Sequence, residues 1–356
     1  MGALPFCPFS LTNRNNKMIV NAQQLPALLT EVLKVGITPY IHGSPGLGKS
    51  DIVRQLAEQH NLEVIDVRLS QADPIDLNGL ISFNKDKSKA QYTPLNTFPI
   101  EGDPLPEGKN GWICFLDEMA SAPLSVQAAA FKLVLDRQVG EFNLHKRVAI
   151  VCAGNKATDG AIVNRISTPM QSRLAHFELA VSKDAWIEWA DRSGIDHRIK
   201  SYISYKPDML YRFDPKHNEY TFPCPRTWEF ASKIIKGNEM TETSLILLTS
   251  VISEAAAREF YSYTRIFNSL PKLEDIVNNP DGAKVTNEPS VNYAVTGLLG
   301  HELTKDNAEP IMKYIARLPI EFQVLCVQSA VASKPELLQN DAVVEWKASH
   351  LSDLMT

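Results

Sequence analysis

The pattern of hydrophobic and polar positions in the first half of the chain alternates between two periods. Apolar side chains recur every three or four positions at Leu25 to Leu33, Ile52 to Ala57 and Val126 to Leu135, which predicts helices. Short β-like runs lie at residues 37–42, 62–69, 112–116, 147–153 and 175–179, and those at 112–116 and 148–153 are continuously apolar. Such runs are typical of strands that are buried on both faces. Strands alternating with helices predict an α/β fold with a parallel sheet.

The pattern changes after Phe177, where helical periodicity dominates and few β-branched runs occur. Prolines interrupt this second half at residues 207–225 and again at 271–289. We therefore expect an all-α lid followed by further helices. The expected organisation is an N-terminal tail at residues 1–17, an α/β core at 18–180, an α-helical lid at 181–240 and a C-terminal helical region at 241–356 that continues the lid.

Residues 70–110 are rich in proline, glycine and charge, and they predict a long insert with small elements inside the core. A loop this long inside a compact domain is usually functional. Its lysines Lys85, Lys87 and Lys89 are read most simply as a solvated loop. Contact with nucleic acid is the alternative, although no series of aromatic residues beyond Tyr92 accompanies them.

Composition narrows the class of protein further. The 356 residues predict roughly two domains. The formal net charge is −5, so no overall basic field favours nucleic acid. The five cysteines never form CxxC, which argues against a disulfide framework and a zinc ribbon and favours a reducing, cytoplasmic setting. The apolar runs are far shorter than the ~18 residues of a membrane span. His42, His145 and His176 fall singly on strands or near their ends without metal-ligand spacing, so we expect core or edge histidines.

One glycine-rich segment carries a specific chemical signal. Residues 43–50 read GSPGLGKS and match GxxxxGK followed by Ser or Thr, between a predicted strand and a predicted helix. In this motif, backbone N–H groups and the helix N-terminus bind phosphate, Lys49 reaches the β- and γ-phosphates, and Ser50 supplies a hydroxyl to Mg²⁺. The residues expected to bind ATP are Gly43, Ser44, Pro45, Gly46, Leu47, Gly48, Lys49, Ser50 and Asp51.

Polar side chains follow two later apolar strands. Asp117 and Glu118 end the run at 112–116, which predicts that Asp117 binds Mg²⁺ and Glu118 activates a water for attack on the γ-phosphate. Asn155 follows the run at 147–153, at the sheet edge where open α/β sheets bind ligands, and could orient that water.

Three arginines are candidates for contact with the transferring phosphate. Arg173 precedes the last predicted strand, and Arg165 lies in a polar loop before it. Either could be an arginine finger, which in trans would require an oligomer with sites at subunit interfaces. Arg226 follows Pro225 at the start of a helix in the α region and could reach back to nucleotide.

These motifs together resemble an AAA+ ATPase of the dynein-related subfamily, and specifically its MoxR-like branch. Residues 43–50 resemble the Walker A motif, Phe115 to Pro123 the Walker B motif with its following helix, and Ala153 to Asn155 sensor 1. Residues 73–80 resemble the start of the helix-2 insert, and residues 225–228 resemble sensor 2. Residues 169–177 resemble the arginine-finger segment, with Arg173 in the finger position. The resemblance covers roughly residues 20–240.

The chain departs from this family at two points. Ser172-Arg173-Leu174 replaces the usual Asn or Asp, Arg, Phe at the finger, and Glu118-Met119-Ala120 replaces the usual Glu-Ile, which leaves the acid intact. The resemblance implies a hexameric, Mg·ATP-driven ring that remodels a protein partner, typically one with a von Willebrand factor A domain. A nucleic-acid motor and a nucleotide switch with little turnover remain alternatives, and a small-molecule kinase is the least favoured.

Overall fold

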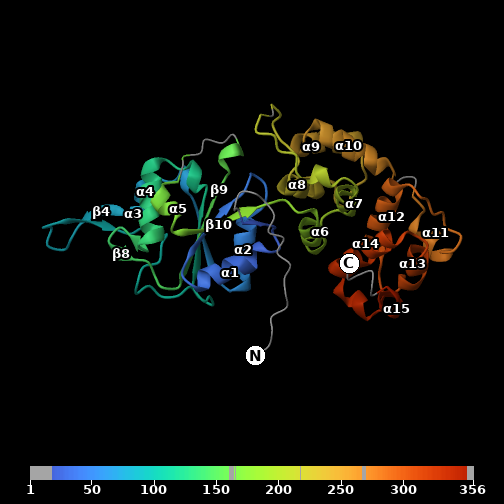
Figure 1. Cartoon of the computed structure of the whole chain (residues 1–356), viewed down its shortest axis with the longest axis horizontal. Coiled ribbons are helices and arrows are strands. Elements are labelled where there is room, and N and C mark those ends of the chain that lie inside the picture. Colours follow the sequence, from blue (N-terminus) through green and yellow to red (C-terminus); the bar gives the residue numbers. More distant parts are fainter. Residues whose placement is uncertain (1–17, 160–163, 165, 217, 267–269, 351–356) are drawn as a thin grey trace. The chain divides into compact units, whose positions relative to one another are not determined.

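In a computed structural model of the chain, residues 18–159, 164, 166–216, 218–266 and 270–350 are described. The chain divides after Val181 into two compact units. The first unit contains all the β-strands among the described residues, and the second consists of helices (Figure 1). Short 3-10 helices lie at Leu69–Gln71, Met119–Ser121, Ala157–Asp159, Pro207–Leu210 and Pro335–Gln339.

A six-stranded parallel sheet forms the centre of the first unit, in the order β1-β10-β2-β9-β6-β3. The strands are β1 (Ile19–Val20), β2 (Thr38–His42), β3 (Glu63–Arg68), β6 (Trp112–Asp117), β9 (Val148–Gly154) and β10 (Leu174–Leu179). Strand β2 has the late strands β9 and β10 as its two neighbours. The chain therefore crosses over the sheet beside β2, and the carboxyl end of this strand opens onto the kind of crevice where α/β sheets bind ligands.

Helices cover both faces of this sheet (Figure 1). Helices α1 (Leu25–Lys34) and α2 (Lys49–Gln59) pack on one face, and α3 (Pro74–Asn78), α4 (Leu124–Leu135) and α5 (Thr168–Gln171) pack on the other. Successive residues of β6 alternate between the two layers: Phe115 belongs to the first and Leu116 to the second, and both are fully buried. The continuous apolar run at this strand follows from burial on both sides.

Residues 70–110 contain small elements. Asp73 is the N-cap residue of helix α3, and its backbone N–H donates to the Asp76 carboxylate at 2.8 Å. Strands β4 (Leu80–Phe83) and β5 (Ala90–Thr93) then form an antiparallel hairpin that extends away from the sheet (Figure 1). A second small hairpin consists of β7 (Gln138–Val139) and β8 (Phe142–Asn143). These last strands and β1 were not predicted.

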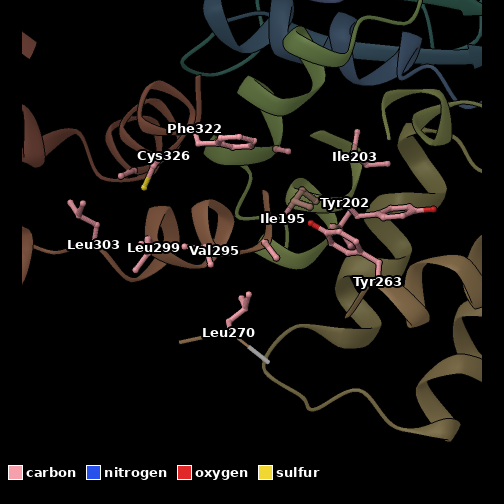
Figure 2. Close-up of a cluster of buried hydrophobic side chains, with 14 of the residues drawn as sticks. Ile195, Tyr202, Ile203, Tyr263, Leu270, Val295, Leu299, Leu303, Phe322 and Cys326 are labelled. Atoms are coloured by element: carbon pink, nitrogen blue, oxygen red, sulfur yellow. The ribbon is translucent and has the colours of Figure 1, made fainter. Parts of the chain in front are cut away.

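The second unit is built from ten described helices around one hydrophobic cluster. They are α6 (Lys183–Arg192), α7 (His197–Tyr205), α8 (Pro225–Ile235), α9 (Glu242–Ile252), α10 (Glu254–Thr264), α11 (Leu273–Asn278), α12 (Pro289–Glu302), α13 (Ala308–Ile315), α14 (Ile320–Ser333) and α15 (Asp341–Ser349). Figure 2 shows part of the cluster, in which Tyr202 of α7 lies beside Tyr263 of α10 with ring centroids 5.3 Å apart. The α/β core followed by a helical region confirms the predicted fold class. Among the described residues, no helix could span a membrane.

Candidate nucleotide-binding site

The loop between β2 and α2 contains two glycines with positive φ. Gly46 and Gly48 have φ of 78° and 80°, in the left-handed region that glycine adopts without strain. Gly48 is the N-cap of α2, which begins at Lys49. The N–H groups of the first turn of a helix and the positive end of its dipole lie at the helix N-terminus, so this end of α2 is a place where an anion can bind. Asp51, in the first turn, is exposed and paired with Arg54 at 3.3 Å.

The Lys49 ammonium lies inside the curve of this loop, and its residue is only 8% exposed. It donates to the carbonyl oxygens of Gly43 at 2.5 Å and Ser44 at 3.2 Å. It also donates to Oδ1 of Asn155 at 3.0 Å, which joins the loop to the end of β9. Two residues predicted separately, 106 positions apart, thus meet at one point.

Ser50 and Asp117 form a pair of oxygen donors next to this lysine. The hydroxyl of Ser50, in the first turn of α2, donates to Oδ2 of Asp117, the last residue of β6, at 3.3 Å. A hydroxyl and a carboxylate are hard oxygen ligands of the kind Mg²⁺ prefers. Among the described residues, no group of three or more His, Cys, Asp or Glu could hold a metal ion. The hydroxyl and carboxylate pair of Ser50 and Asp117 fits Mg²⁺, which commonly takes one or two protein ligands and completes its shell with phosphate and water.

Glu118 stands at the turn directly after β6. Its backbone N–H donates to Oδ1 of Asp117 at 2.8 Å, and its φ of 57° is left-handed. Its carboxylate accepts a hydrogen bond from the Ser70 hydroxyl. Ser70 follows β3, and β3 lies beside β6 with Arg68 opposite Asp117. No motif marked Ser70, because its place beside Glu118 depends on this strand register.

A second unpredicted contact fixes the loop from the other side. The Ser44 hydroxyl donates to Oδ1 of Asp159 at 2.9 Å, and the backbone N–H of Lys156 donates to Oδ2 at 3.0 Å. Asp159 is 9% exposed. Next to it, the Lys156 ammonium pairs with Glu178 of β10 at 2.6 Å. The segment after β9 therefore supports the phosphate-binding loop as well as supplying Asn155.

The arginine candidates fall in different parts of the structure. Arg173 is exposed in the short link between α5 and β10, and its backbone N–H donates to the Met170 carbonyl at 3.1 Å. Arg226 is exposed in the first turn of α8, in the second unit. Arg165 lies outside the described residues.

Residues 40–174 match the family model of the AAA domain, dynein-related subfamily. The matched segment contains the glycine-rich loop at residues 43–50 and strands β3, β6 and β9 of the parallel sheet. A solved structure described as a "putative ATPase" from Cytophaga hutchinsonii ATCC 33406 is similar at 14% identity and a TM-score of 0.38, over 87% of this chain and 81% of that one. No curated protein matches the chain.

Proposed function

We propose that the chain is a Mg·ATP-dependent AAA+ ATPase of the MoxR type, which hydrolyses ATP at the subunit interfaces of a homo-oligomeric, hexameric ring. One observation carries this proposal. Lys49, Ser50, Asp117 and Asn155 come from three segments and converge at the carboxyl ends of β2, β6 and β9 through direct hydrogen bonds. Phosphoryl transfer needs a cation, metal ligands and a group that orients water, and Lys49, the Ser50–Asp117 pair and Asn155 could supply them in this order.

Each of these side chains has a role in hydrolysis. The loop amides and Lys49 bind the β- and γ-phosphates. Ser50 and Asp117 would hold Mg²⁺, which would supply positive charge to neutralise the phosphate oxygens. Since Oδ1 of Asn155 faces Lys49, its amide NH₂ is left to hold the attacking water. Glu118 accepts a proton from this water while the oxygen attacks the γ-phosphorus and the bond to the bridging oxygen breaks, which yields ADP and phosphate.

The arginines complete this site in the proposal. Exposed Arg173 reaches the γ-phosphate of a neighbouring subunit and stabilises the transferring charge, an effect of about 10³ to 10⁵ in rate. Arg226 senses the γ-phosphate from the helical unit. Hydrolysis then shifts the helical unit and remodels a protein partner, for which the family resemblance favours a von Willebrand factor A domain.

The test compares ATP turnover over a range of protein concentrations for the wild type and Arg173→Ala, with mass determination in ATP. We expect cooperative activation as a ring forms, and loss of hydrolysis with retained ATP binding in Arg173→Ala. The control is Arg258→Ala, a surface arginine paired with Glu254 in the helical unit. Turnover that does not depend on concentration or on Arg173 refutes the interface site. Unchanged turnover in Glu118→Gln refutes the assignment of the base.

A further inference from the structure

Two histidines in the first unit contact each other beside the phosphate-binding loop. His42 is the last residue of β2, next to Gly43, and His176 lies in β10, three residues after Arg173. Nε2 of His42 is 2.9 Å from Nδ1 of His176, and their rings stack with centroids 5.1 Å apart. Nε2 of His176 is 2.8 Å from the backbone carbonyl oxygen of Gln171, at the end of α5.

The partners fix the direction of these hydrogen bonds. A carbonyl oxygen only accepts, so Nε2 of His176 carries the proton and donates to Gln171. In the tautomer with the proton on Nε2, Nδ1 of His176 is the acceptor, and Nε2 of His42 donates to it. A continuous chain of donors and acceptors therefore runs from the last residue before the P-loop to the helix that precedes Arg173.

Three kinds of contact hold the segment that carries Arg173. Local hydrogen bonds run from the Gln171 side chain to the Ile166 carbonyl at 2.8 Å and from the Arg173 N–H to the Met170 carbonyl. Strand β10 begins directly after Arg173 and pairs with β2, with Leu174 opposite Thr38. The histidine pair adds a side-chain link from the end of β2 to the Gln171 carbonyl, which precedes Arg173. The backbone on both sides of Arg173 is therefore linked to the strand that ends in the P-loop.

We infer that His42 and His176 are positioning residues, which hold the Arg173 segment against the P-loop strand and so aim the finger that a subunit offers to its neighbour. This inference rests on the proposed function, in which Arg173 of one subunit acts at the active site of its neighbour. If it holds, breaking the link impairs the neighbour's active site and spares the subunit's own P-loop. The kcat should fall by roughly 10- to 100-fold, as for a catalytic group displaced by about 1 Å, while the KM for ATP stays unchanged.

Two kinds of variant separate this role from simple packing. His176→Phe keeps a ring and removes both hydrogen bonds. His42→Gln keeps an N–H donor where His42→Met has none, so we expect near wild-type kcat in His42→Gln and the full loss in His42→Met. His145→Phe, at the T-shaped contact with Trp112, is the matched control. Equal kcat in the Gln and Met variants overturns the inference, as does a rise in KM that accounts for the whole loss.

Mixed rings provide the deciding experiment. Glu118→Gln subunits cannot hydrolyse ATP but offer an intact finger, so mixing them with Arg173→Ala subunits should restore turnover at about a quarter of the interfaces. His176→Phe subunits mixed in the same way should regain turnover to the same extent. If Arg173→Ala is not complemented, the finger in trans fails and the proposed function with it. If Arg173→Ala is complemented and His176→Phe is not, the histidine pair acts on its own P-loop and only this inference is wrong.

Discussion

Gly154→Ala perturbs the end of β9, where it packs against Tyr40 of β2. A Cβ at Gly154 would lie 2.1 Å from Oη of Tyr40, 3.1 Å from its Cζ and 3.3 Å from Cβ of Ala120. Tyr40 is 1% exposed, so its ring has no open space to enter. The strain must therefore move the end of β9, which also carries the Gly154 carbonyl that accepts from Gly43 N–H and the adjacent Asn155.

The magnitude follows from this contact. Overpacking a tight core costs about 1–3 kcal/mol, which for a unit of this size lowers its melting temperature by about 2–12 °C. A shift of Asn155 by about 1 Å lowers turnover by about 100-fold. Tyr40→Phe in the same chain removes Oη and leaves Cζ at 3.1 Å, a contact that needs a movement of only a few tenths of an ångström. Gly154→Ala/Tyr40→Phe should therefore recover most of the stability and of the turnover.

The assay combines thermal unfolding with steady-state ATP turnover for the wild type, both single variants and the double variant. Tyr40→Phe alone is the control for loss of the hydroxyl. The reasoning is refuted if Gly154→Ala matches the wild type in both measurements, or if the second substitution leaves its defect unchanged.

Three further predictions concern buried polar groups. Asp159→Ala leaves the Ser44 hydroxyl without its carboxylate partner, so we expect the affinity for ATP to fall several-fold and the free energy of unfolding of the first unit to fall by about 1–3 kcal/mol. In titrations with a fluorescent nucleotide, the double variant Asp159→Ala/Ser44→Ala should bind about as weakly as Asp159→Ala alone, because both substitutions remove the same hydrogen bond. Lys200→Met leaves the buried Asp191 carboxylate without the ammonium at 2.5 Å, and it should lower the free energy of unfolding of the helical unit in urea by about 3–5 kcal/mol. The double variant Lys200→Met/Asp191→Leu should recover most of this loss, and a double variant no more stable than Lys200→Met contradicts the prediction. Burial lowers the pKa of His197 from 6.5 to about 4, so the unfolded chain binds the extra proton first and stability falls as pH drops from 6.5 to 4, by about 3 kcal/mol in all. His197→Gln should flatten this slope in unfolding curves measured across that range, and an unchanged slope contradicts the assignment.

Local sequence signals determine much of this fold. The apolar run before Asp117 predicts β6 because both faces of the strand are covered, and the glycines before Lys49 predict a left-handed loop because other residues resist that conformation. The two-residue strand β1 has no such signal, since its pairing with β10 depends on an edge that exists only in the folded sheet.

The contacts within the candidate site were less predictable than its residues. Ser70 reaches Glu118 only because β3 and β6 share a particular register, and the His42 and His176 rings meet across 134 residues of sequence. Each histidine alone looks like an edge residue of a strand. Register between distant parallel strands is set by the packing of both sheet faces, so the sequence around either residue contains no trace of it.

The left-handed backbone conformation of Glu118 bears on how this position evolves among related proteins. A glutamate at φ 57° costs about 1–2 kcal/mol relative to a residue that adopts this conformation freely. The chain bears that cost at the position where the proposed mechanism requires a carboxylate. In a lineage released from the need to hydrolyse ATP, selection for stability alone would favour glycine or asparagine there. The residue that follows the β6 aspartate in a relative should therefore predict, before any assay is made, whether that relative hydrolyses ATP.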